Sequence, residues 1–213
     1  TGTATDDFEK HRTRAELVVE MGTVRRLSER LNVPLVVPVF PRPRSEPVDS
    51  SHYVHQLDRD TLAIDDGDLE RVDRQLLRMV DDATRRLSDT GRSFSGQVML
   101  NGFSASGNFV DRFTVLHPDR VSSVTAGGLN GMALLPLEEA KGRTLNYHVG
   151  IADVEELTGD PVDLEAIDEV DQFLYMGSED TNDTIPYTDA WTSDELRETA
   201  LEVYGEDMIV DRF

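Results

Sequence analysis

The feature that most constrains the fold is a short apolar run that leads directly into a serine flanked by small residues. Residues 97–109 read Gln-Val-Met-Leu-Asn-Gly-Phe-Ser-Ala-Ser-Gly-Asn-Phe, and apolar positions then recur at helical spacing as far as Leu116. An apolar β-type run, a small-x-Ser-x-small turn and a helical pattern predict a strand, a sharp bend and a helix. Ser104 stands at the bend, between Gly102 and Ser106.

The spacing around Ser104 has a physical reason. A serine on so tight a turn has strained backbone, and the residues two before and two after it must be small to avoid the adjoining strand and helix. Such a turn lifts the hydroxyl clear of the sheet, and the helix that begins near Ser106 directs free N–H groups toward it. This is typical of a nucleophile elbow, although a plain strand–helix turn with a solvated serine gives the same pattern.

Charge is the most unusual property of the composition. The chain has 42 acidic and 21 basic residues, a net charge of −21, and lysine only at Lys10 and Lys141. An acidic, lysine-poor surface is typical of proteins from a salt-saturated cytoplasm, and an acidic mesophilic protein is the alternative. Because there is no basic patch to release counterions, nucleic acid and anionic membranes are poor partners.

The length of the chain and its lack of cysteine limit the kinds of protein that it can be. A chain of 213 residues is long enough for one domain with a substantial core, and without cysteine it has no disulfide, thiolate metal site or cysteine nucleophile. No apolar run approaches the length of a membrane span, and no signal peptide is visible. We therefore expect a protein without a membrane span, in the cytoplasm rather than secreted.

Helical and strand patterns alternate along the rest of the chain. Apolar residues recur at helical spacing over 9–31 and 69–87, and Thr192 with Glu195 forms a capping box for a last helix. Short apolar runs predict strands buried on both faces at 34–40, 121–126 and 172–177. The sequence therefore predicts a single α/β domain over 1–213, with a mostly parallel sheet covered by helices on both faces.

Two longer segments connect these elements. Residues 41–62 are rich in proline, arginine and histidine, and they predict a binding loop over the carboxyl edge of the sheet. His52 and His55 in this loop could share a metal ion, but no third ligand lies at a useful spacing. Residues 129–170 are irregular, with an extended piece at 145–151 and a helix near 163–170, and an excursion of this size predicts a cap over a pocket.

A turn crowded with carboxylates follows the strand expected at 172–177. With Gly102-Phe-Ser-Ala-Ser-Gly107 and Tyr175-Met-Gly-Ser-Glu-Asp180 in place, the chain resembles the α/β-hydrolase superfamily. It is most similar to a branch of haloarchaeal-type hydrolases that are distantly related to esterases and depolymerase-like enzymes. The resemblance extends over nearly the whole chain in element order, but only the elbow and the Gly-x-x-Asp turn are motif-like.

The resemblance implies an acyl-transfer reaction on a small-molecule ester or related acyl substrate, without a metal or a cofactor, and it leaves ester, thioester, amide and polyester substrates open. It implies Ser104 as the nucleophile and Asp180 as the carboxylate that orients a histidine. Asp183 is the runner-up for that carboxylate, and Asp153 is a third choice.

The same resemblance implies two N–H donors for the oxyanion. One is the backbone N–H of Ala105, and the other comes from a loop of which Gly2 and Thr3 would be the remnant.

Two features depart from the family pattern. The order should be serine, aspartate, histidine, yet the last histidine is His148, before Asp180, so no general base can be assigned. Strands before the first helix and a final strand with the histidine loop are also missing, so we expect an internal piece of a larger domain. One alternative is a non-catalytic α/β-hydrolase-like binding protein without the histidine. A nucleotide binder is disfavoured, because no Gly-x-Gly-x-x-Gly follows a first strand.

Overall fold

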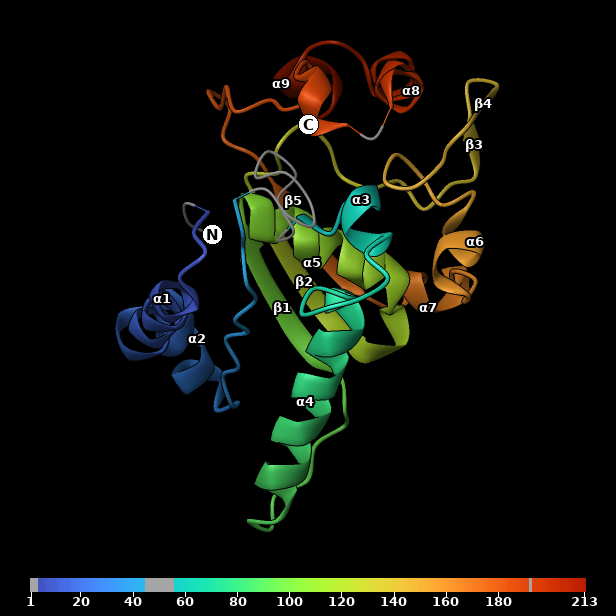
Figure 1. The fold of residues 1–213 in the computed structure, drawn as a ribbon. Helices are drawn as coiled ribbons and strands as arrows, with labels where there is room; N and C mark the ends of the chain where they lie inside the picture. Colours follow the sequence, from blue (N-terminus) through green and yellow to red (C-terminus); the bar gives the residue numbers. More distant parts are fainter. Residues whose placement is uncertain (1–3, 45–55, 192) are drawn as a thin grey trace.

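The computed structural model describes residues 4–44, 56–191 and 193–213, with only the backbone of Asp189. At its centre lies a three-stranded sheet in the order β1 (Val98–Phe103), β2 (Val121–Gly127) and β5 (Asp171–Tyr175) (Figure 1). Both strand pairs are parallel, with Gly102 opposite Ala126 and Ala126 opposite Leu174. The predicted α/β class with a parallel sheet is therefore confirmed.

One face of the sheet carries the main core. Helix α5 (Ala105–Leu116) packs on β1 and β2, and buried side chains of α4 (Val72–Ser88) join the same core (Figure 1). The regular apolar spacing of α4 explains this placement, because one stripe of the helix points to the core. The buried side chains of these four elements include Val72, Leu76, Val80, Val110, Phe113, Val121, Val124 and Ala126.

The other face of the sheet is open, so the expectation of helices on both faces is wrong for the described chain. Met99 and Phe103 of β1 and Phe173 and Tyr175 of β5 project there and are 39–63% exposed. Every residue of β5 is exposed, although the run at 172–177 was expected to be buried on both faces. The reason is position: β5 is an edge strand, and burial of a strand depends on its neighbours rather than on its own sequence.

The N-terminal region forms two helices instead of the continuous pattern at 9–31. Helix α1 (Phe8–Met21) and helix α2 (Thr23–Leu31) meet at Gly22, where an added Cβ would lie only 2.4 Å from the Val18 carbonyl oxygen. Only glycine fits this bend.

The strand expected at 34–40 is absent. The segment is extended and partly exposed, and it has no ladder partner within the described chain. Pro34 and Pro38 explain the difference, because each removes an N–H donor that a ladder requires. At its end the Phe40 ring stacks on Phe109 of α5, with ring centroids 6.1 Å apart.

The excursion over 129–170 contains short elements. They are β3 (Glu139–Ala140), β4 (Arg143–Thr144), α6 (Val154–Thr158) and α7 (Leu164–Asp168), which confirms the helix expected near 163–170. The piece at 145–151 is not a strand, but Tyr147 in it is fully buried and joins the main core with Leu129 and Ile151. These contacts anchor the excursion to the same body as the sheet.

The remaining elements are short, apart from one C-terminal helix. Helix α8 (Asp194–Tyr204) is capped by Ser193, whose hydroxyl accepts from the Leu196 N–H, while Thr192 of the expected capping box lies outside the described residues. The others are α3 (Arg59–Leu62), α9 (Met208–Asp211) and the 3-10 helices η2 (Pro118–Arg120) and η3 (Thr188–Ala190). None of the helices in the described ranges has the length and apolar character needed to cross a bilayer.

Candidate active site

Ser104 lies at the junction between β1 and α5, with φ 60° and ψ −134°. This backbone conformation is strained for a residue with a side chain. Its N–H donates to the Gly127 carbonyl oxygen of β2 at 2.9 Å, and its carbonyl oxygen accepts from the N–H groups of Gly107 and Asn108. The neighbouring strand and the first turn of α5 thus hold the strained residue in place, which confirms the predicted strand, sharp turn and helix.

The small residues around Ser104 are needed for close contacts. A Cβ on Gly102 would lie 2.0 Å from the Ser106 carbonyl oxygen, and a Cβ on Gly107 would lie 2.7 Å from the Gly127 carbonyl oxygen. Ser106 serves the turn as well, since its hydroxyl donates to the Phe103 carbonyl oxygen at 2.8 Å. Sequence reasoning missed Gly127, although a glycine pair at the end of a strand is a signal for close backbone approach.

The Ser104 side chain is partly exposed, and its hydroxyl has no hydrogen-bond partner among residues 4–44, 56–191 and 193–213. Ala105 is the first residue of α5, so its N–H lies outside the helical hydrogen-bond ladder. The dipole of α5 adds positive potential at the same end. Gly2 and Thr3, expected to mark the second oxyanion donor, lie outside the described residues.

The loop after β5 gives its two candidate carboxylates different surroundings. Asp183 accepts from the Ile185 N–H at 3.1 Å and from Arg212 Nη1 at 2.8 Å, and the side chain of Arg212 is fully buried. Asp180 accepts from the Asn182 N–H at 2.9 Å and forms no ion pair within the described chain. Asp183 is therefore committed to a structural contact, and Asp180 retains free acceptor positions.

The third choice, Asp153, is also engaged. Its carboxylate accepts from Arg59 and from the Tyr147 N–H, which ties α3 to the excursion. Asp153 therefore has a structural role.

The histidines in the described ranges make their contacts away from Ser104. His148 is buried, its Nδ1 accepts from the Arg59 N–H at 3.4 Å, and its ring stacks on Trp191 with centroids 5.1 Å apart. His11 Nε2 lies 3.3 Å from the Thr5 carbonyl oxygen. The suggested metal pair, His52 and His55, lies outside the described residues. No histidine in the described ranges is hydrogen-bonded to Ser104, so the structure assigns no general base among the described residues.

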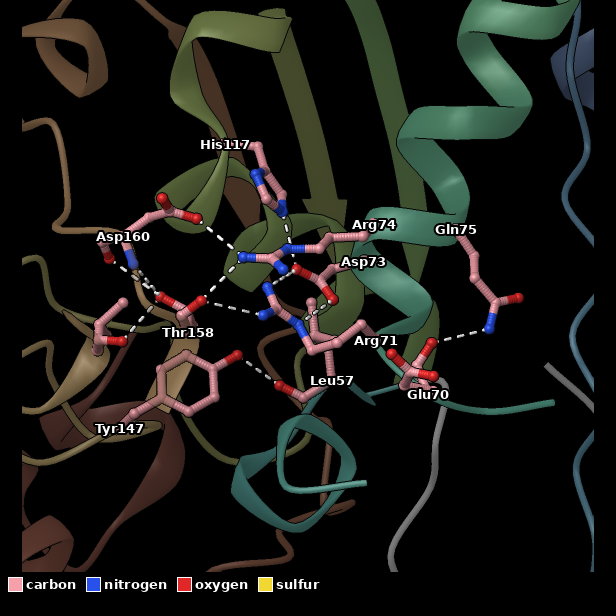
Figure 2. Close-up of polar contacts among 11 residues, drawn as sticks. Leu57, Glu70, Arg71, Asp73, Arg74, Gln75, His117, Tyr147, Thr158 and Asp160 are labelled. Atoms are coloured by element: carbon pink, nitrogen blue, oxygen red, sulfur yellow. Dashed lines mark hydrogen bonds and ion pairs between the residues drawn. The ribbon is translucent and has the colours of Figure 1, made fainter. Parts of the chain in front are cut away.

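A histidine–carboxylate pair does occur elsewhere (Figure 2). His117 Nε2 lies 2.9 Å from Asp73 Oδ2, and Arg71 donates to the same fully buried carboxylate through Nε at 2.9 Å and Nη2 at 2.6 Å. Burial by itself raises the pKa of Asp73, but hydrogen bonds from His117 and Arg71 outweigh it and hold that pKa well below the usual range. Arg71 also reaches the Thr158 carbonyl oxygen of α6.

The pair of His117 and Asp73 is too far from Ser104 to serve it. Ser104 precedes the first residue of α5, and His117 follows the last. The 12 helical residues between them, at about 1.5 Å per residue, separate the two by roughly 18 Å. This pair therefore fixes the other end of α5.

Two cavities lie away from the elbow. One, of about 290 Å³, is lined by residues around Arg143 and the start of α8, and the other, of about 250 Å³, lies between α1 and the segment with Val37 and Val39. Among the described residues there is no group of three or more side chains suited to a metal ion.

Comparisons with protein-family models, with curated proteins and with solved structures find no match for this chain. The support for the candidate site therefore comes from its geometry.

Proposed function

We propose that this protein is a serine hydrolase of the α/β-hydrolase type, which acts on an ester-type substrate through an acyl-enzyme at Ser104. The observation that carries the proposal is the backbone of Ser104, with φ 60° and ψ −134° at the junction of a parallel strand and a helix. Its hydroxyl is not used by the described part of the fold, whereas the hydroxyl of Ser106 is.

In the proposed reaction, Ser104 Oγ attacks the ester carbonyl carbon while its proton passes to a histidine base. The alcohol leaves with that proton, and water then hydrolyses the acyl ester and restores the serine. The Ala105 N–H and the N-terminus of α5 stabilise the oxyanion that forms in each step. An oxyanion donor of this kind typically contributes about 3–4 kcal/mol.

Asp180 is the carboxylate that we assign to the histidine. It follows β5 and Ser104 follows β1, so both belong to the carboxyl edge of the sheet, with β2 between them. Strands about 4.8 Å apart put roughly 10 Å between the ends of β1 and β5. Asp180 lies in the loop five residues beyond the end of β5.

The proposal is tested by labelling the intact protein with a fluorophosphonate probe in concentrated potassium chloride. We expect the probe on Ser104, loss of labelling in Ser104→Ala, and unchanged labelling in Ser93→Ala, which removes an exposed hydroxyl between α4 and β1. Equal labelling of Ser104→Ala and the wild-type protein would exclude Ser104 as the nucleophile.

A second candidate is a binding protein with an α/β-hydrolase-like elbow but no catalysis. It is favoured by one observation: none of the described hydrogen bonds of His11, His117 and His148 is made with Ser104. Turnover of p-nitrophenyl esters by the intact protein separates the two candidates, because a binding protein binds an ester without releasing the alcohol.

A further inference from the structure

Two surfaces hold most of the large apolar side chains that are exposed in the described chain. One is the open side of the sheet, here called the bare sheet face, with Met99, Phe103, Phe173 and Tyr175. The other is the helix pair α1–α2. Eleven of the nineteen exposed large apolar side chains belong to one of the two; those of the helix pair are Phe8, Leu17, Val18, Val19, Met21, Leu27 and Leu31. On α1, Leu17 and Met21 are one turn apart and share a face, whereas Val18 and Val19 point to other sides of the helix. Exposure concentrated in this way marks interaction surfaces.

The bare sheet face is apolar and carries little charge, and the Tyr175 ring lies over Gly127 in its middle. In the ladder register, Met99 and Phe103 flank Ser123 and Gly127 on one side, and Phe173 and Tyr175 flank β2 on the other. Small residues thus run along the middle strand between large ones. Asp171 is the one charged residue of the three strands that shares this face.

Helix α2 offers a matching surface. Leu27 and Leu31 are one turn apart, and Arg26 and Arg30 form the adjacent row at the same spacing. Neither arginine makes an ion pair within the described residues. Leu27 and Leu31 are both nearly half exposed.

The charge of the chain is divided between the two surfaces. Residues 1–44 hold eight basic and six acidic side chains, whereas residues 45–213 hold 13 basic and 36 acidic ones. The helix pair is therefore slightly positive and the body with the sheet is strongly negative. At low ionic strength, attraction between the two parts favours a contact that joins them, whereas in concentrated salt the apolar area carries the contact.

Within one chain the helix pair does not cover the bare sheet face, whose large side chains are exposed. The Thr5 N–H donates to the Arg42 carbonyl oxygen, and the Arg44 N–H donates to Asp6, which joins the two ends of the segment. Phe40 packs on Phe109 of α5, on the opposite side of the sheet. Figure 1 shows α1 and α2 beside β1 and away from α5.

We propose that α1–α2 of one copy packs on the bare sheet face of a second copy and that the exchange is reciprocal, giving a symmetric dimer. Each of the four surfaces exposes on the order of 450 Å² of apolar side chain, because large side chains have about 150–250 Å² each and these are about half exposed. Two such contacts remove roughly 1,800 Å², the size of a stable protein interface.

The test uses the absence of cysteine from the chain. Leu27→Cys and Phe173→Cys are made in separate copies of the intact protein, mixed in concentrated potassium chloride and oxidised. We expect a disulfide-linked dimer of one copy of each variant. Mixing Leu164→Cys, an equally exposed leucine on α7, with Phe173→Cys is the matched control and gives no such dimer.

A second measurement separates exchange between copies from folding back within one chain. In sedimentation experiments the wild-type protein is a dimer, and Leu27→Glu with Leu31→Glu raises the dimer dissociation constant roughly 100-fold, whereas Leu164→Glu does not. A wild-type monomer would overturn the proposal. A double variant with Leu27→Cys and Phe173→Cys in the same copy provides a further check. Cross-links formed only within one chain of this variant would also overturn the proposal. Neither readout depends on catalysis, so the dimer and the proposed hydrolase activity fail or hold separately.

Discussion

Ser104 is a strained residue that three backbone hydrogen bonds keep in place. A side-chain-bearing residue in this conformation costs on the order of 1–3 kcal/mol. The bonds from Ser104 to Gly127, Gly107 and Asn108 offset that cost, and they require the close backbone approach that Gly102 and Gly107 permit. At the scale of single residues, the elbow therefore depends on glycine as much as on serine.

Gly102→Ala tests this dependence. Its Cβ would lie 2.0 Å from the Ser106 carbonyl oxygen, so the strand or the helix must shift. We expect the free energy of unfolding to fall by about 3 kcal/mol, measured by urea denaturation at constant salt. Gly177→Ala is the control, because its Cβ would meet Asp180 at an ordinary 3.8 Å. Equal stability of the two variants would show that the elbow is less tightly packed than described.

Asp111 gives the fold a predictable pH dependence. Burial raises the pKa of Asp111 to about 6, against the opposing effects of the Leu134 N–H and the Arg112 charge. In the unfolded chain an aspartate has a pKa of about 3.9. Between these values the folded state binds more protons, so the contribution of Asp111 to stability is present near pH 4 and is lost as the pH rises through 6.

We therefore expect Asp111→Asn to gain stability relative to the wild-type protein as the pH rises from 4 to 6. The gain should be on the order of 2–3 kcal/mol, measured as the difference between the two unfolding free energies across that range. A constant difference would mean that Asp111 titrates normally. Asp82→Asn, at an exposed carboxylate on α4, serves as the control.

At the scale of elements, α5 is fixed at both ends by different means. Its N-terminus is held by β2 through Gly127, and its C-terminus is held by His117, which contacts Asp73 in the first turn of α4. Arg71 extends the second contact to α6. The proposed nucleophile thus stands on a helix whose far end is tied to two other helices.

Asp73→Asn should loosen this far end. The change removes the charge that holds Arg71 and His117, and breaking a buried ion pair costs about 3 kcal/mol or more. Asp82→Asn on the same helix removes exposed pairs with Arg85 and Arg86 and should cost about 0.5 kcal/mol or less. Thermal unfolding at one salt concentration compares the two, and similar losses would contradict the structural role of Asp73.

The elements differ in how far the sequence could predict them. The turn at Ser104 was predictable, because its strand, small residues and helix are local and each must be present. The prediction of a strand at 34–40 was wrong because it gave more weight to the apolar residues than to Pro34 and Pro38, which cannot donate hydrogen bonds to a sheet. The exposure of β5 and the contact between His117 and Asp73 depend on segments far away in the sequence, so no local pattern reveals them.

At the scale of the whole molecule, charge is the dominant property. The chain has a net charge of −21 on 213 residues. Its carboxylates repel one another more strongly in the folded state, where they are closer together than in the unfolded chain. At about 1 M salt the screening length is only about 3 Å, so this repulsion is largely removed.

We expect the midpoint of thermal unfolding to rise by roughly 10 °C between about 0.1 M and about 3 M potassium chloride, which corresponds to a few kcal/mol in a chain of this size. Circular dichroism melts over a salt series provide the measurement. Comparison with sucrose at matched water activity separates screening from general exclusion effects. A midpoint that does not change with salt would contradict the view that the surface is adapted to concentrated salt.

The most direct measurement of the central claim is the site of acyl transfer. The intact protein is mixed with p-nitrophenyl acetate in concentrated potassium chloride, quenched in acid within milliseconds to seconds, and digested for mass spectrometry. We predict one acetyl group on the peptide that contains Ser104, and no acetylated peptide from Ser104→Ala. An acetyl group on another residue, or alcohol release that is unchanged in Ser104→Ala, would contradict the account.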